Sequence, residues 1–109
     1  MTKDIIRQGD VLLVPAKVIP STAVPVEAEN GLHILARGEM TGHHHSIRAR
    51  EGICMFRDDG AGGGAQYVSG LDGDKLAHQE HTALQTTAPV MRAIIQRTVQ
   101  SGMARRVED

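Results

Sequence analysis

Residues 5–20 read IIRQGDVLLVPAKVIP, and this stretch favours extended backbone over helix. It is rich in Ile, Val and Leu, and successive apolar residues from Val11 to Pro15 would point to alternate sides of a strand. Three prolines between positions 15 and 25 disfavour a helix, because proline has no backbone N–H to donate. The prolines therefore favour a sheet edge or an extended loop for the later part of the stretch.

Further short segments of strand character follow, each bounded by a turn signal. They are residues 32–39 (entered through Asn30-Gly31), 44–51, 52–59, 65–70 and 90–100. Residues 75–86 are compatible with strand or helix, the glycine-rich run 60–64 predicts a mobile loop, and the tail 101–109 predicts fraying or one helical turn. The pattern predicts an all-β fold, a small β-barrel or sandwich that forms a single domain over residues 1–109.

Composition restricts the classes of function. The 109 residues carry 12 basic and 13 acidic side chains, and the only aromatic residues are Phe56 and Tyr67. Balanced charge and scarce aromatic rings argue against direct binding of nucleic acid. A single cysteine excludes an intrachain disulfide and a cysteine-rich zinc site. No signal peptide or long apolar segment is apparent, so we expect an intracellular protein that does not enter a membrane.

The histidines are unevenly distributed along the chain. Three of the six stand in a row within GEMTGHHHSI, residues 38–47. Residues two apart in a strand point to the same side, so His43 and His45 can aim two imidazoles into one cavity while His44 faces outward. Such a pair is suited to clamp a metal ion. The isolated His33, within LHIL, is expected to be a structural or surface residue.

A second group of polar residues follows in AHQEHT, where His78, Glu80 and His81 offer two ring nitrogens and a carboxylate. His78 and Glu80 share a face if the segment is a strand, whereas His78 and His81 converge in a helical turn or a bulge. We expect the two groups to form one divalent-metal site, with zinc first and nickel, iron or manganese as alternatives. The predicted ligands are His43, His45, His78 and His81. If a coordination position stays open, Glu80 is the candidate general base.

Five segments carry a resemblance to a known family. They are RQGDVL (7–12), GEMTGHHHSI (38–47), LAHQEH (76–81), QR (96–97) and RVED (106–109). Their GxxTGHxH and LxHxEH motifs are similar to those of small uncharacterised proteins from phages, prophages and bacterial genomes. The resemblance implies that the histidines of the two motifs are the candidate functional residues. It also implies that the protein is located in the cytoplasm of a bacterial host cell. Some small phage accessory proteins inhibit host defence nucleases, including as anti-CRISPR factors, so a protein partner is the alternative expectation.

The order of the histidines also resembles that of cupins, small β-barrels in which an HxH pair is followed by a Glu and a later His. His43, His45, Glu51 and then His78 or His81 imitate that order. The spacing from His45 to Glu51 is longer than in cupins, and the second cupin motif with its PxG turn is absent. The resemblance implies a metal-lined β-fold and a metal-dependent hydrolase or oxygenase as a further alternative.

Other chemistries have weaker support in the sequence. Cys54 could act as a nucleophile with a histidine, but its apolar neighbours Ile53 and Met55 favour a buried core residue. Phosphoester chemistry with two histidines requires two HxS/T motifs, and only His44-His45-Ser46 supplies one. The remaining contrast is between a binding protein with a closed, structural metal site and an enzyme with an open one.

Overall fold

The chain folds into β-strands and the turns that join them. A computed structural model describes residues 4–37, 42–59, 65–100 and 103–106, and in these residues no segment is helical. The strands are β1 (Ile6–Gln8), β2 (Val11–Pro15), β3 (Val24–Val26), β4 (Leu32–Arg37), β5 (His44–Arg48), β6 (Cys54–Asp58), β7 (Ala65–Ser69), β8 (Lys75–Ala77), β9 (Leu84–Gln85), β10 (Met91–Ile95), β11 (Arg97–Gln100) and β12 (Met103–Arg106). The prediction of an all-β fold is confirmed.

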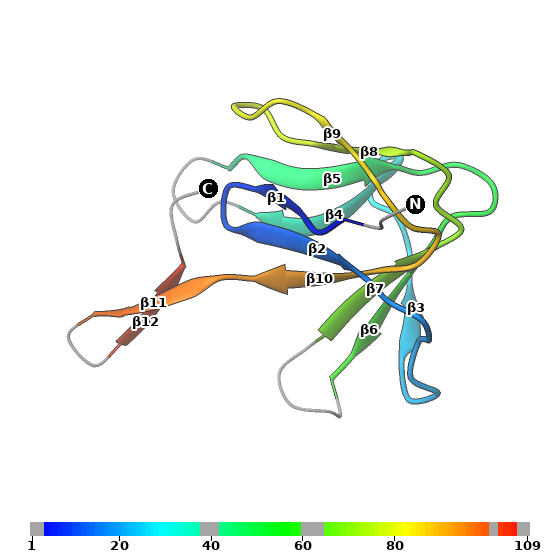
Figure 1. The fold of residues 1–109 in the computed structure, drawn as a ribbon, viewed down its shortest axis with the longest axis horizontal. Helices are drawn as coiled ribbons and strands as arrows, with labels where there is room; N and C mark the ends of the chain where they lie inside the picture. The colour runs from blue at the N-terminus through cyan, green and yellow to red at the C-terminus, as the bar shows by residue number, and fades with distance from the viewer. Residues whose placement is uncertain (1–3, 38–41, 60–64, 101–102, 107–109) are drawn as a thin grey trace.

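The strands form two main antiparallel sheets that face each other (Figure 1). The larger sheet has the strand order β1-β2-β10-β7-β6-β3, and the smaller one has the order β4-β5-β8-β9. Strands β11 and β12 form a separate hairpin, which extends away from the two sheets in Figure 1. Of the two predicted architectures the sandwich is the observed one, because the sheets do not close into a barrel. The cupin-like barrel is therefore not supported.

Several predicted elements change their bounds or type. Residues 75–86 form two short strands, β8 and β9, and not a helical turn. The expected strand 90–100 is divided at Gln96 into β10 and β11. The backbone N–H of Gln96 still donates to the carbonyl of Asp10 (2.8 Å), the residue that comes next in the register of β10 with β2. The C-terminal segment contains strand β12 where a helical turn was the alternative to fraying. The predicted loop 60–64 lies outside the described residues.

The core lies between the two sheets and follows the alternation expected of strands. In β2, Val11 and Leu13 are fully buried while their neighbours are partly exposed, which confirms the pattern seen in the sequence. Alternate residues of β10 are buried in the same way. The smaller sheet contributes three large apolar side chains to this core, those of Leu35, Ile47 and Leu76. Strand β3, which contains Pro25, is the edge of the larger sheet, as the missing proline N–H requires.

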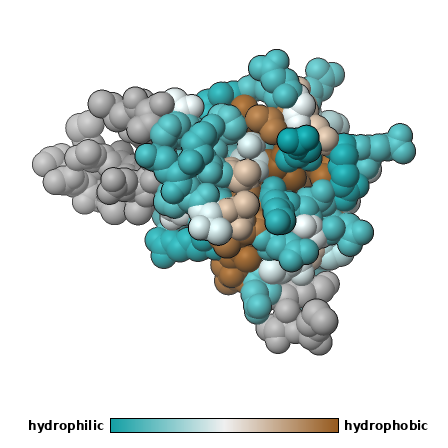
Figure 2. Space-filling view, turned by 90° about the horizontal axis from the view of Figure 1, so that it is seen from above, coloured by the Kyte–Doolittle hydropathy of each residue, from teal (hydrophilic) through white to brown (hydrophobic). Residues whose placement is uncertain are grey.

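The face of the molecule shown in Figure 2 is largely polar. Seen from above, hydrophobic residues form a narrow band in the middle of the face, and hydrophilic residues surround it (Figure 2). This arrangement is typical of a small sandwich whose inner faces supply the core and whose rims and loops meet water. No helix in the described residues is long and apolar enough to cross a membrane.

The backbones of two loops of the sandwich approach each other closely at Gly70. Gly70 follows β7 and has a φ of +75°, and a Cβ atom built on it would lie 1.9 Å from the carbonyl oxygen of Gly52. A carbonyl group of the backbone cannot move aside as a flexible side chain can. The residue at position 70 must therefore lack a side chain, for reasons of both contact and conformation.

We predict that Gly70→Ala lowers the free energy of unfolding by more than about 2 kcal/mol, because left-handed strain and a backbone clash add together. Gly31→Ala is the matched control, since Gly31 has a similar φ of +78° but nothing within 4 Å of the added Cβ atom. Its expected cost is about 1 kcal/mol, from the conformation alone. Urea unfolding of the three proteins measures both values, and equal losses in the two variants would contradict the close-approach argument.

An ion pair joins the same loops. The guanidinium of Arg50 binds both carboxylate oxygens of Asp74, at 2.8 Å from Nε and 2.7 Å from Nη2, and Nη2 also donates to the carbonyl of Gly70 (3.1 Å). The hydrogen bonds from Arg50 are the main reason why the pKa of Asp74 falls from 3.8 to about 2. Because the folded-state pKa is lowered, the ionised carboxylate stabilises the fold above its unfolded pKa and loses this effect as the pH falls toward 2.

We therefore expect Asp74→Asn to destabilise the protein most near neutral pH and progressively less below about pH 4. The measurement is the difference in urea midpoint between wild type and variant, at about pH 6 and about pH 3. Asp72→Asn is the control, because this exposed neighbour is not the carboxylate that Arg50 binds. A difference that stays constant across this range would mean that the carboxylate charge of Asp74 does not stabilise the fold.

A candidate site formed by four histidines

The candidate site lies where the β1–β2 hairpin meets the smaller sheet (Figure 1). His45 belongs to β5, and His43 directly precedes that strand. His78 and His81 lie in the connection between β8 and β9. Since β8 pairs with β5 through Ser46↔Ala77, the second group of histidines begins beside the first. Strand pairing thus brings together two segments that are more than thirty residues apart in the sequence.

The rings of His43, His45, His78 and His81 form one cluster. The ring centroid of His78 lies 4.3 Å from that of His45, 4.6 Å from that of His81 and 5.6 Å from that of His43. His45 and His81 are 6.0 Å apart, with their planes inclined by 22°. His78 is therefore the central ring. His45 is fully buried, His78 is nearly so, and His43 stands at the rim with 30% of its side chain exposed.

A buried glutamine fixes the tautomer of His45. The side-chain nitrogen of Gln8 donates to the carbonyl oxygens of Leu76 and Thr82, both at 3.0 Å, and this orients the amide. Its oxygen then lies 2.8 Å from Nδ1 of His45. An amide oxygen can only accept a hydrogen bond, so Nδ1 carries the proton. In the neutral imidazole the lone pair of His45 is consequently on Nε2.

The other side of the same ring faces a buried carboxylate. Nε2 of His45 is 3.3 Å from Oδ1 of Asp10, and neither side chain has any exposed surface. Gly9, with a φ of +58°, allows the tight turn that puts Gln8 on one nitrogen of the ring and Asp10 on the other. A lone pair and a carboxylate in such close contact repel each other in a dry interior unless a cation lies at the contact. A proton or a metal ion can supply that charge.

Glu80 interacts with both groups of histidines. Its Oε1 lies 3.1 Å from Nδ1 of His43, and its backbone N–H donates to Nδ1 of His78 (3.0 Å). A carboxylate accepts, so Nδ1 of His43 is the donor and Nε2 of His43 is left to face another group. The Glu80 side chain is 60% exposed and lies at the rim of the cluster.

The remaining histidines differ in their surroundings. Nε2 of His81 is buried and has no hydrogen-bond partner among the described residues. His44 takes no part in the ring contacts among the four clustered histidines, and its backbone N–H donates to the side chain of Gln79 (2.9 Å). His33 is buried in β4, where burial lowers its pKa. As the side chains stand, no three His, Cys, Asp or Glu residues in the described part of the chain are arranged so that they could hold a metal ion.

Two of the residues that define this site, Gln8 and Asp10, could not be predicted as site residues from the sequence. Their neighbours along the chain do not indicate that they bracket an imidazole from β5. A polar-glycine-polar turn before a buried strand was the only available signal. Cys54 requires a correction, because it is exposed on β6 and not in the core, while its neighbours Ile53 and Met55 point inward. Successive side chains of a strand point to opposite faces, so Cys54 faces outward when Met55 faces the core.

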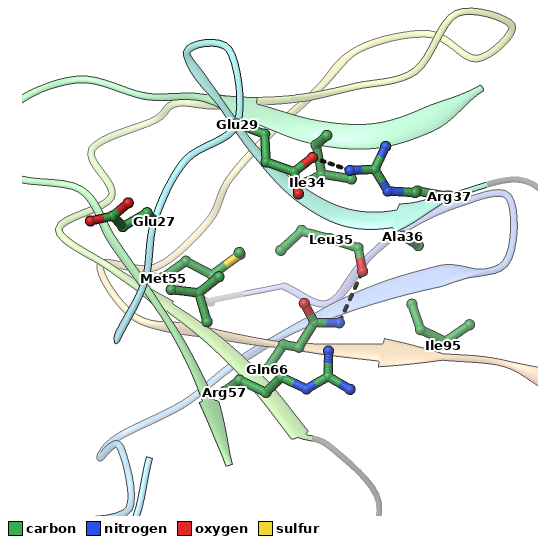
Figure 3. A pocket seen from close by; sticks show the side chains of 11 residues that line it. Glu27, Glu29, Ile34, Leu35, Ala36, Arg37, Met55, Arg57, Gln66 and Ile95 are labelled. Atoms are coloured by element: carbon green, nitrogen blue, oxygen red, sulfur yellow. Dashed lines mark hydrogen bonds and ion pairs between the residues drawn. The ribbon is translucent and has the colours of Figure 1, made fainter. Parts of the chain in front are cut away.

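A separate cavity of about 440 Å³ lies between the sheets, and none of the clustered histidines lines it (Figure 3). Gln66 crosses it from β7 and donates to the carbonyl of Leu35 (2.9 Å), the residue at which a bulge interrupts the pairing of β4 with β5. On its wall Arg37 is paired with Glu29. The cavity is thus a gap between the two sheets that is distinct from the histidine site.

Comparison with protein families gives a match that covers most of the chain. Residues 7–96 match the family described as Domain of unknown function (DUF8820). No curated protein and no solved structure matches the chain. All six residues that build the site lie inside the matched segment, namely Gln8, Asp10, His43, His45, His78 and His81, together with Glu80 at its rim.

We predict that Gln8→Leu destabilises the fold by about 3 kcal/mol, because it leaves two carbonyl groups and Nδ1 of His45 without their buried partner. Gln79→Leu is the control, since it removes a single bond from an exposed glutamine and should cost under about 0.5 kcal/mol. Urea unfolding of both variants measures these values. Equal stability of Gln8→Leu and wild type would show that the glutamine does not hold the site together.

Proposed function

We propose that this chain, which belongs to the DUF8820 family, binds a divalent transition-metal ion in its histidine cluster. The contact between His45 and Asp10 carries the proposal. Its nitrogen and oxygen atoms are 3.3 Å apart in a fully buried place. Two ligands of one tetrahedral zinc ion, each bonded at about 2.0 Å, are also about 3.3 Å apart. A metal ion at this contact would remove the repulsion between the lone pair of the ring and the carboxylate.

The outer partners of the ring support this role. Histidines that bind metals usually donate their second N–H to a carbonyl or a carboxylate, which fixes the tautomer and makes the other nitrogen more basic. Gln8 receives that hydrogen bond from His45. Glu80 is the corresponding partner of His43. Both rings therefore keep Nε2 as the nitrogen that can bind the metal.

We assign His81 as the third ligand. Its buried Nε2 has no partner in the described part of the chain, and its ring lies 6.0 Å from that of His45. His81 and His43 both lie outside strands, so rotation about their side-chain bonds can bring them to a metal held by the two anchoring residues. His43, which stands at the rim of the cluster, would be the residue available as a fourth ligand.

The donor set favours zinc. It combines imidazole nitrogens with one carboxylate oxygen and lacks a thiolate, which suits Zn²⁺, Ni²⁺, Fe²⁺ or Mn²⁺ better than Cu⁺. Zinc accepts this set in tetrahedral geometry. The other functions expected from the sequence, a phage inhibitor of defence nucleases and a metal-dependent enzyme with Glu80 as base, stay predictions.

We expect wild type to bind one Zn²⁺ per chain, and His45→Ala and Asp10→Asn each to weaken binding by more than about 100-fold, because each removes one of two preformed ligands. Isothermal titration with ZnCl₂, together with elemental analysis after dialysis, gives affinity and stoichiometry. His44→Ala and His33→Ala are the matched controls, one adjacent to the site and one buried outside it. Both should bind as wild type does.

Two results would contradict the proposal. One is wild-type protein that takes up no divalent metal while its NMR spectrum shows a proton on both nitrogens of His45, because the contact with Asp10 would then be an ion pair. The other is an equal loss of binding in the His33, His44 and His45 variants, which would indicate nonspecific uptake. Circular dichroism of each variant establishes that the fold is retained.

A further inference from the structure

We infer that His78 is not a ligand of the metal but a hydrogen-bond donor to a small oxyanion that binds the metal at its fourth position. This inference rests on the proposed metal site. It departs from the pattern of the sequence, in which His78 and His81 appear as equivalent ligands. The ligand class is a carboxylate or another small oxyanion that enters at the rim and displaces the ring of His43.

The orientation of the His78 ring is fixed by its own loop. Nδ1 accepts a hydrogen bond from the backbone N–H of Glu80, at 3.0 Å. Turning the ring over would place a C–H group against this N–H and leave the donor without its acceptor. A nitrogen that accepts has no proton, so the proton of neutral His78 is on Nε2. That nitrogen has no lone pair to give to a metal ion.

His45 has the opposite tautomer in the same cluster. Its Nδ1 donates to Gln8, so its Nε2 is the one with a lone pair. The two rings are close neighbours, with centroids 4.3 Å apart, yet one offers a lone pair and the other an N–H. Adjacent imidazoles of opposite tautomer suit a site that binds a cation with one ring and an anion with the other.

The position of His78 fits this role. It is the central ring of the cluster, within 4.3 to 5.6 Å of the three other clustered rings, and its Nε2 is buried. A donor there would lie beside a metal held by His45, Asp10 and His81.

Charge favours an anion as the fourth ligand. A divalent metal with one carboxylate and two neutral imidazoles has a net charge of +1, and a monovalent oxyanion neutralises it in a place with little access to water. The path from solvent is at the rim, where His43 is 30% and Glu80 is 60% exposed. An oxyanion that enters there replaces His43 as the fourth ligand and accepts the hydrogen bond of His78. No bond is broken in the bound molecule.

The test uses protein loaded with Co²⁺, whose visible absorption reports changes in coordination, titrated with acetate as the probe. His78→Phe keeps a ring but removes the donor, whereas His78→Gln puts an amide N–H close to the former Nε2. We expect all three proteins to bind Co²⁺ with affinities within a few-fold of each other. Acetate should bind about 10- to 100-fold more weakly to His78→Phe than to wild type, and His78→Gln should recover part of the loss.

The outcomes separate this inference from the metal site itself. If His78→Phe loses Co²⁺ as completely as His45→Ala does, His78 is a ligand and the inference is wrong. If it keeps both Co²⁺ and wild-type acetate binding, His78 is not a donor and the inference is again wrong. Wild type that binds no Co²⁺ at all would overturn the proposed function, and the inference with it.

A measurement on metal-free wild type avoids reliance on variants that could misfold. Two-bond ¹H–¹⁵N correlation spectra distinguish ring nitrogens with and without a proton. We expect the proton of His78 on Nε2, with Nδ1 unprotonated. A proton on Nδ1 of His78 with a lone pair on Nε2 would overturn the inference, because the ring would then be prepared as a ligand.

Discussion

The structure around the candidate site depends on one buried imidazole held between two polar side chains of a single turn. His45 has no exposed surface, and Gln8 and Asp10 lie on its two nitrogens. Burial makes each of these contacts obligatory, since a polar group that loses its partner in a dry interior costs as much as a lost hydrogen bond or more. The β1–β2 turn and strand β5 can therefore occupy only one position relative to each other.

This constraint also ties the two sheets together. Gln8 belongs to the larger sheet, and its amide nitrogen reaches the carbonyls of Leu76, in β8, and Thr82, in the loop after β8 that carries the second histidine group. One side chain thus sets the tautomer of His45 and holds the loop of His78 and His81 against it. A metal ion at the His45–Asp10 contact would act on the same junction, so metal binding and the stability of the sandwich are expected to be linked.

Rigid and adaptable parts are combined within the cluster. His45 and Asp10 are fixed by a strand and a tight turn, whereas His43 and His81 lie outside the strands. In the proposed metal site, two fixed and two adjustable members would take up the ion without rearrangement of the backbone. The ring orientation of His78 is set by the backbone amide of Glu80. In the inferred arrangement His78 is therefore a hydrogen-bond donor, whereas its neighbours are metal ligands.

By itself the sequence determined the all-β class, most of the strand segments and the two histidine groups. Alternation of apolar residues is a local property, so β2 and β10 could be recognised from their patterns. The prolines indicated a sheet edge or an extended loop, because proline lacks an N–H to donate to a neighbouring strand. The i, i+2 spacing of His43 and His45 needed no tertiary information either. Only the tertiary structure decided that the sheets form a sandwich, that Cys54 faces solvent, and that Gln8 and Asp10 bracket His45. These features depend on which strands pair across long separations in sequence, and on which atom of a ring meets which neighbour. Local patterns do not encode either of these.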